Sequence, residues 1–161
     1  MKNLKKLFLF LNLALFLYGC GYTPIFEAQK SFFQIEKYET FGDKKIANLF
    51  IERVKQFQNA TNENVRKIHI TVSAKKKRNI LVKNTSGKVL TYQSEIALDV
   101  KVKYFPSDMF IFEGQLKETM NYKNKDQKSE MTSLENKITD DLIDSMSRDL
   151  ILIINQSNEK Q

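Results

Sequence analysis

Cysteine has the most nucleophilic side chain in this 161-residue chain, and the chain holds only one, Cys20. A single cysteine cannot form an internal disulfide, so in an exported chain its thiol pairs with another molecule, reacts or is modified. The preceding segment has the three parts of a secretory signal: lysines at positions 2, 5 and 6, an apolar run from Leu7 to Leu17 broken only by Asn12, and the small Gly19. This run is well short of the ~20 residues that span a bilayer, which favours a cleaved signal over a transmembrane helix.

The four residues Leu17-Tyr18-Gly19-Cys20 resemble the lipobox of bacterial lipoproteins. In that family the cysteine is acylated on sulfur, the signal is cut before it, and the new amine is acylated as well. The resemblance therefore implies that residues 1–19 are removed and that residues 20–31 form an acylated tether. More than one acyl chain gives stable anchoring, because each buried CH₂ contributes ~0.8 kcal/mol. The alternative is an ordinary cleavage nearby that leaves a free thiol.

A group of basic residues is the second feature of the sequence that could bind a ligand. Six of them fall within 14 positions with no acid among them, and we call them the basic cluster: Lys75, Lys76, Lys77, Arg78, Lys83 and Lys88. Lysine and arginine bind phosphate groups through charge and charge-assisted hydrogen bonds. The aliphatic run 80–82 inside the cluster could contact acyl chains. The alternative is a solvated strand edge, since exposed lysines also block edge pairing.

The charge of the chain bears on its partners. The net charge is +7, and the loss of three lysines with residues 1–19 leaves +4. A basic chain normally suggests nucleic acid as a partner. Export removes nucleic acid from consideration, so we expect the basic surface to face membrane lipid, glycolipid or protein.

Catalysis finds little support in the sequence. The single histidine, His69, has no second histidine and no free cysteine with which to build a metal site. No nucleophile elbow, phosphate loop or dinucleotide-binding glycine motif occurs. Asp140 and Asp141 are adjacent on an expected helix, where neighbouring side chains point about 100° apart. We therefore expect no enzyme, no metal, and no cofactor beyond the covalent lipid on Cys20.

In the first half of the expected domain, the spacing of the apolar residues changes twice along the sequence. Residues 32–38 read as a strand, and Gly42-Asp43 breaks it and offers a helix N-cap. From Lys44 the apolar residues follow helical spacing, up to a stop at residues 59–62: Ile46, Leu49, Phe50, Val54 and Phe57. The period then falls to two over Ile68–Ala74, which predicts a half-buried strand with His69 facing outward.

The second half predicts two long strands and a helix. Residues 84–87 form a turn, so the basic cluster is expected around the tip that joins the second and third strands. Strands are predicted over residues 90–104 and 110–122, with a tight turn at Pro106 and a bulge or close approach at Gly114. A helix is predicted to begin with a Thr132–Glu135 capping box. Its apolar stripe comprises Ile138, Leu142, Met146, Leu150 and Ile153, and fraying is expected from Asn155.

These elements predict an α+β fold in the order strand, helix, strand, strand, strand, helix. We expect a four-stranded, mainly antiparallel sheet with two helices packed on one face. The single domain should span residues 32–156, followed by a frayed tail at 157–161. Strands of about 14 residues would form a ribbon of roughly 45 Å, which is longer than two short helices can cover.

The start Cys20-Gly21-Tyr22-Thr23-Pro24 completes a pattern that resembles one family. Together with the lipobox, the element order and the closing amphipathic helix, it resembles the LPS-assembly lipoproteins known as LptE. Members often begin with Cys-Gly, an aromatic residue, one variable residue and Pro. The likeness covers essentially all of the mature chain.

This resemblance implies a function. LptE proteins sit in the outer membrane on its periplasmic side, plug the lumen of the large β-barrel LptD, help that barrel assemble, and bind lipopolysaccharide. Gly21 after the cysteine, rather than Asp, fits sorting to the outer membrane. The basic cluster is then the candidate lipopolysaccharide contact by its chemistry alone. Two alternatives are a different outer-membrane lipoprotein that acts as an envelope scaffold or binding module, and a periplasmic enzyme.

Overall fold

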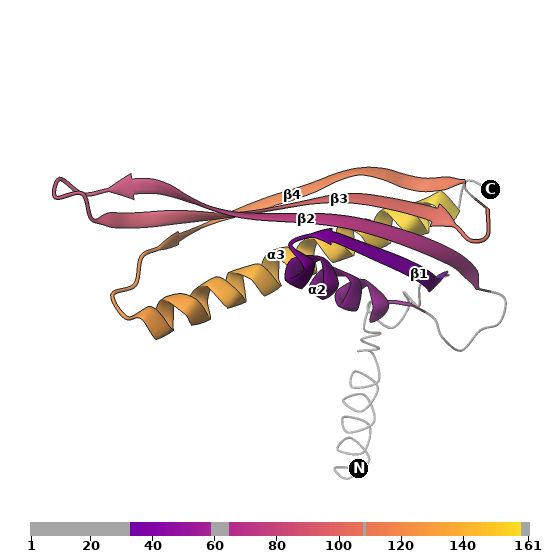
Figure 1. The fold of residues 1–161 in the computed structure, drawn as a ribbon, viewed down its shortest axis with the longest axis horizontal. Coiled ribbons are helices and arrows are strands. Elements are labelled where there is room, and N and C mark those ends of the chain that lie inside the picture. The colour runs from indigo at the N-terminus through magenta and orange to yellow at the C-terminus, as the bar shows by residue number, and fades with distance from the viewer. Residues whose placement is uncertain (1–32, 59–64, 108, 159–161) are drawn as a thin grey trace, which may run out of the picture.

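A computed structural model describes residues 33–58, 65–107 and 109–158 of the chain. The elements are β1 (Phe33–Gly42), α2 (Lys44–Lys55), β2 (Arg66–Lys83), β3 (Val89–Tyr104), β4 (Phe110–Lys123) and α3 (Lys128–Asn158). The α+β prediction and its element order are confirmed, and both helices lie on the same face of the sheet (Figure 1). The predicted signal and tether, with Cys20, lie outside the described residues.

The sheet has the strand order β1-β2-β3-β4. β1 pairs with β2 in parallel, whereas β2–β3 and β3–β4 are antiparallel, so the sheet is mixed. A parallel pair needs a crossover connection, and α2 lies within it. The antiparallel pairs are the connected hairpins that the short turns predicted. "Mainly antiparallel" is therefore correct, with β1 as the exception.

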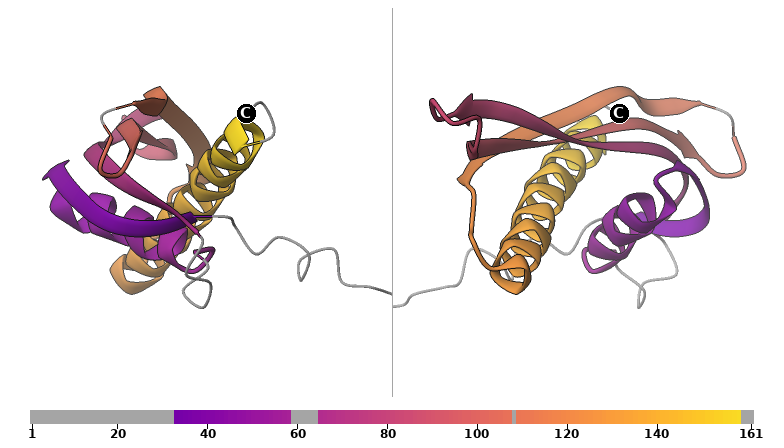
Figure 2. Two further views of the ribbon diagram at one scale, coloured as in Figure 1. Left: turned by 90° about the vertical axis from the view of Figure 1, so that its right-hand side faces the viewer. Right: turned by 60° about the vertical axis from the view of Figure 1, so that its left-hand side comes forward.

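One core lies between the sheet and the helices. The alternating residues of β2 and β3 that face the helices are fully buried, as their period of two predicted: Ile68, Ile70, Val72, Ala74, Ile96, Leu98, Val100 and Val102. The helices cover them with buried residues that include Phe50 and Val54 of α2 and Met146 and Leu150 of α3. Figure 2 shows both helices beneath the sheet, with the opposite face of the sheet uncovered.

The junction between β1 and α2 follows the predicted chemistry. Gly42 has a φ of +71°, and a Cβ there would clash with the carbonyl oxygen of Ala74 on β2. Asp43 donates its backbone N–H to that same oxygen at 2.9 Å. The Asp43 Oδ1 then accepts the N–H of Ile46 at 3.2 Å, which is an N-cap bond. Glycine is required here because the turn and the close backbone approach leave no space for a side chain.

The structure corrects the second strand. β2 does not stop near Ala74 but continues to Lys83, and its pairing with β3 extends to Val89. The apolar alternation ends at Ala74 because the next helix-facing positions of β2 hold Lys76 and Arg78, which contact α3 through polar groups. Backbone pairing continues without a buried face, so Lys75–Arg78 lie within a strand and not in the turn.

The structure also corrects both helices. α2 ends at Lys55, before the predicted stop at residues 59–62. α3 begins at Lys128, four residues before Thr132, so the predicted capping box is wrong. The Thr132 hydroxyl donates instead to the carbonyl of Lys128 at 3.0 Å. α3 also continues through Asn155 to Asn158, because Ile151 and Ile154 near its end are buried in the core.

The molecule is long and has two different ends (Figure 1). At the far end, the β2–β3 hairpin projects beyond β4 and α3. At the near end, β1 begins beside Arg66, and Phe105 of the β3–β4 turn donates its N–H to Lys67 at 2.9 Å. Within the described ranges, none of the helices has the length and apolar character that a membrane crossing requires.

Candidate functional site

Strand alternation divides the basic cluster between the two faces of the sheet. Lys76 and Arg78 continue the row of Ile68–Ala74 and face the helices. Lys75 and Lys77 lie on the uncovered face, because successive side chains of a strand point to opposite sides. Lys83 and Lys88 flank the hairpin turn. The prediction that most of the six residues lie near one tip is therefore wrong, and only Lys83 and Lys88 lie there.

The two cluster residues on the helix face are engaged with α3. Lys76 Nζ donates to Thr139 Oγ1 at 2.7 Å. Arg78 Nη1 lies 3.0 Å from Glu135 Oε1 in an ion pair. These contacts fix the N-terminal half of α3 against β2, so Lys76 and Arg78 have a structural role and are the weakest candidates for ligand contact.

Arg78 belongs to a four-residue group that we call the clamp, formed by Arg78, Tyr92, Tyr122 and Glu135. The Tyr122 hydroxyl donates to Glu135 Oε1 at 2.8 Å. The two tyrosine rings are stacked with centroids 5.8 Å apart, and the guanidinium carbon of Arg78 lies 4.9 Å from the centroid of the Tyr92 ring. The clamp thus joins β2, β3, β4 and α3 at the base of the projecting hairpin.

The electrostatics of the clamp follow from these contacts. Burial opposes ionisation of Glu135, but hydrogen bonds from Tyr122 and Arg78 outweigh that effect and lower its pKa. Burial, together with the bond to Glu135, raises the pKa of Tyr122 well above its ordinary value. Sequence reasoning assigned Glu135 to a helix cap and missed this group. The missed signal was the pair of tyrosines on facing strands, which are cross-strand partners.

The remaining cluster residues are more available. Among the described residues, no hydrogen bond or ion pair engages the side chains of Lys75, Lys77 or Lys83, whereas Lys88 Nζ lies 2.7 Å from Asp126 Oδ1. Glu95 stands opposite Lys77 on β3 but pairs with Lys117 at 3.2 Å. We therefore take Lys75, Lys77 and Lys83 as the candidate contacts for an anionic group.

Aliphatic side chains accompany these lysines on the hairpin. Ile80, Leu81 and Val82 on β2 are 52%, 45% and 46% exposed, and Leu90 on β3 is 44% exposed. We call residues 80–90 the hairpin arm. Its exposed apolar surface beside cations suits a ligand that carries both acyl chains and phosphates, or a protein surface of matching character.

The other residues considered from the sequence form no chemical site. His69 lies on the uncovered face as predicted, with its Nε2 3.8 Å from Glu39 Oε1. Asp140 borders a groove of about 610 Å³ between α2 and α3, whereas Asp141 is exposed and does not line it. Across residues 33–58, 65–107 and 109–158, no group of three or more histidine, cysteine, aspartate or glutamate residues is placed to hold a metal ion.

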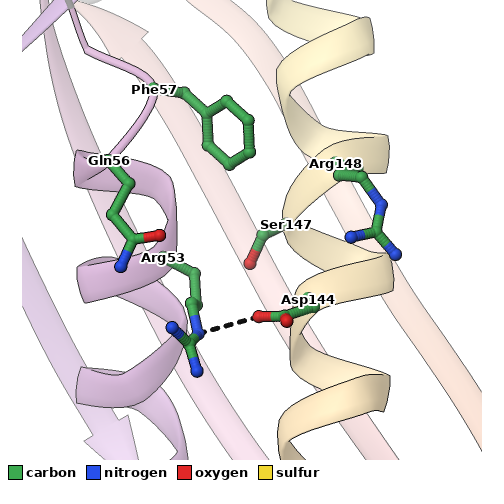
Figure 3. Close-up of a pocket in the computed structure, with 6 residues that line it drawn as sticks. All are labelled: Arg53, Gln56, Phe57, Asp144, Ser147 and Arg148. Carbon is green, nitrogen blue, oxygen red and sulfur yellow. Dashed lines mark ion pairs between the residues drawn. The ribbon is translucent and has the colours of Figure 1, made fainter. Parts of the chain in front are cut away.

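A smaller pocket of about 190 Å³ lies further along the two helices (Figure 3). Arg53 Nε of α2 and Asp144 Oδ1 of α3 form an ion pair of 2.7 Å across it. The Ser147 hydroxyl donates to the carbonyl of Ile143 at 2.7 Å and so is not a free nucleophile. The ion pair across this pocket connects α2 and α3, so we assign these residues a structural role.

Comparisons with known proteins identify the fold. The chain shares its fold with bacterial lipoproteins. A solved candidate lipoprotein from Caulobacter crescentus CB15 matches with a TM-score of 0.58 and 12% identity, over 84% of this chain and 96% of that chain. Rare lipoprotein B from Shewanella oneidensis matches with a TM-score of 0.51 and 15% identity, over 77% of this chain and 96% of that chain. A minor lipoprotein from Acinetobacter baumannii matches with a TM-score of 0.55 and 13% identity, over 76% of this chain and 92% of that chain. No family model matches the sequence, and no curated protein is similar to it in sequence.

These likenesses concern the fold, because sequence identities of 12–15% leave few side chains in common. The shared region spans most of each solved chain, so the similarity covers whole domains and not an isolated hairpin. Cys20 lies outside the described residues, so its lipoprotein interpretation stays a prediction.

Proposed function

We propose that this chain is an outer-membrane lipoprotein that plugs a β-barrel lipopolysaccharide translocon, assists its assembly and binds lipopolysaccharide during delivery to the cell surface. In this proposal Cys20 carries the acyl chains and the protein faces the periplasm. The partners are a large LptD-like barrel, lipopolysaccharide and membrane lipid, and no catalytic step is involved.

One observation carries the proposal, the hairpin arm. It projects beyond both helices, exposes aliphatic side chains, and lies next to lysines that have no internal partner among the described residues. An exposed apolar surface of this kind indicates a binding partner. A barrel wall would cover an arm that the helices leave bare, and lipopolysaccharide offers both acyl chains and phosphates.

The fold and the sequence support the proposal from a second direction. Rare lipoprotein B and the other solved lipoproteins have the same arrangement of sheet and helices. The sequence adds the lipobox pattern and the Cys-Gly-Tyr-Thr-Pro start that resembles LptE. The remaining candidate is an envelope scaffold with this fold, which would have no stable barrel partner.

Charge reversal tests the lipopolysaccharide part of the proposal. We expect the variant Lys75→Glu/Lys77→Glu/Lys83→Glu to bind purified lipopolysaccharide about tenfold or more weakly, since a hydrogen bond to a charged group contributes ~1.5–3 kcal/mol. The matched control is Lys44→Glu/Lys45→Glu/Lys137→Glu, which changes the net charge equally on exposed helix positions. Equal loss of binding in both variants would indicate a non-specific charge effect and would remove the site assignment.

A further inference from the structure

The near end of the molecule carries a second exposed apolar surface, which we call the near-end tip. It consists of Phe105, Met109 and Phe110 around the β3–β4 turn, and these side chains are 42%, 56% and 48% exposed. Tyr104 donates its N–H to the carbonyl of Met109 at 3.0 Å across the turn. Exposure of two phenylalanines and a methionine at one extremity is costly in water, and it indicates that another surface covers them.

Cations surround the near-end tip. Lys103 Nζ lies 4.6 Å from the centroid of the Phe110 ring, and Arg66 donates to the Tyr104 hydroxyl at 3.0 Å. Lys67 lies beside the turn and pairs with Glu36 at 3.0 Å. Aromatic rings at the boundary with long basic side chains form the pattern that proteins present to a membrane interface.

The position of the tip relative to the N-terminal segment identifies the covering surface. Phe33, the first described residue, pairs with Arg66 at this same end. Cys20 lies 13 positions earlier, and 13 extended residues reach at most about 47 Å. The far end is about 55 Å away along β2. An acylated Cys20 therefore attaches the molecule to the lipid through its near end, where β1 begins.

We propose that the near-end tip docks on the lipid surface that holds the acyl chains of Cys20. Phe105, Met109 and Phe110 enter the interfacial layer, and Arg66, Lys67 and Lys103 lie at the level of the phosphates. The docked lipoprotein stands on its near end and keeps the hairpin arm away from the bilayer until a partner takes it. This inference rests on the acylation in the proposed function, but it concerns the lipoprotein alone, before any barrel is bound.

Site-specific fluorescence tests the docked state with the full-length lipoprotein. Acylation consumes the thiol of Cys20, so Met109→Cys introduces a single free thiol at the tip, and Ser86→Cys provides the matched position in the opposite hairpin turn. Each is labelled with an environment-sensitive dye and reconstituted into phosphatidylethanolamine–phosphatidylglycerol vesicles that contain lipids brominated near the headgroup. We expect the dye at position 109 to be quenched at least threefold more than the dye at position 86. Equal quenching at both positions, which indicates a flat orientation, or none at position 109 would overturn the proposal.

A second pair of variants shows whether the apolar side chains cause the contact. Phe105→Ser/Phe110→Ser should abolish the excess quenching at position 109, whereas Ile80→Ser/Leu81→Ser at the far end should leave it unchanged. All four side chains are exposed, so the fold should tolerate both changes, and circular dichroism checks this. Loss in both variants, or in neither, would contradict docking by the tip.

The same reagents separate this inference from the proposed function. Wild-type protein takes up the dye only if Cys20 is not acylated, so labelling of the wild type would reject the anchor itself. In that case flotation of the unacylated chain with the same vesicles still tests the tip. Flotation that Phe105→Ser/Phe110→Ser abolishes would support it, and absence of flotation would reject it.

Discussion

Glu135 shows how one side chain can connect a helix to two strands, β2 and β4. Its carboxylate accepts hydrogen bonds from Arg78 and Tyr122, and both bonds lower its pKa against the opposing effect of burial. A carboxyl group with a lowered pKa in the folded state stabilises that state when it is ionised. The contribution is therefore present above the ordinary pKa of 4.5 and is lost as the pH falls through the lower value in the folded protein.

We expect Glu135→Gln to lower the free energy of unfolding by about 1–2 kcal/mol at pH 7, because two charge-assisted hydrogen bonds weaken. Urea denaturation of the variant and the wild type at pH 7 and pH 3 measures this. The difference between them should shrink at pH 3, because this lies below the ordinary pKa of 4.5, where the unfolded wild-type chain already binds a proton at this carboxyl group. An equal difference at both pH values would contradict an ionised Glu135 at the centre of the clamp.

Gly42 is a second residue whose role the structure makes specific. Gly42 and Gly87 both have a positive φ, +71° and +84°, but a Cβ at Gly42 would clash with the carbonyl oxygen of Ala74, whereas at Gly87 it would meet open space. The left-handed conformation alone costs a non-glycine residue about 1–2 kcal/mol.

Gly87→Ala should therefore lower the free energy of unfolding by about that amount, and Gly42→Ala by clearly more, since it adds a backbone clash. Thermal and urea denaturation of the two variants compare the effects directly. Similar losses for both would show that the close approach of β1 to β2 is not maintained in solution.

At the scale of elements, the apolar periods predicted the buried parts of the fold well. The period of two over Ile68–Ala74, the helical stripe from Ile46, and the Gly42-Asp43 break all have a direct physical cause that the structure confirms. The length of β2 was missed because the side chains of its outer half are mostly exposed and so show no apolar alternation, although Lys76 and Arg78 still contact α3. For the same reason the sequence did not predict that the basic cluster is divided between the two faces of the sheet, since side chains alternate between faces only within a strand.

The capping box failed for a different reason. A Thr-x-x-Glu pattern predicts a helix start from local bonds, but here Glu135 bonds with distant residues of β2 and β4. Local sequence cannot rank such a tertiary contact against a cap. The helix instead begins at Lys128, where the N–H of Met131 bonds with the carbonyl of Gln127 at 3.0 Å.

The hairpin arm should be dispensable for folding. We expect replacement of residues 81–91 by Asn-Gly, which leaves Ile80 opposite Tyr92 as the closing pair, to change the free energy of unfolding by less than about 1 kcal/mol. The removed residues include none of the buried core residues, and the clamp stays intact. Urea denaturation with circular dichroism measures the change. A large loss of stability would show that the hairpin arm contributes to folding as well as to any binding.

The two ends of the molecule differ in the surfaces that they expose. β1 begins at the near end, which also carries the near-end tip, while the far end carries the hairpin arm with its lysines and aliphatic side chains. The helices cover the middle of one sheet face and leave both ends bare (Figure 2). In our account the near end belongs to the membrane and the far end to the barrel and its lipopolysaccharide.

A pull-down of the tagged lipoprotein from detergent-solubilised envelopes of its native host, with partners identified by mass, tests the central claim most directly. The shortened-hairpin variant serves as a folded control. If the chain plugs a barrel, the wild type should recover one large β-barrel protein in roughly equal amount, and the variant should recover markedly less of it. Recovery of the acylated wild type alone would contradict the transport assignment and leave a lipid-anchored α+β scaffold.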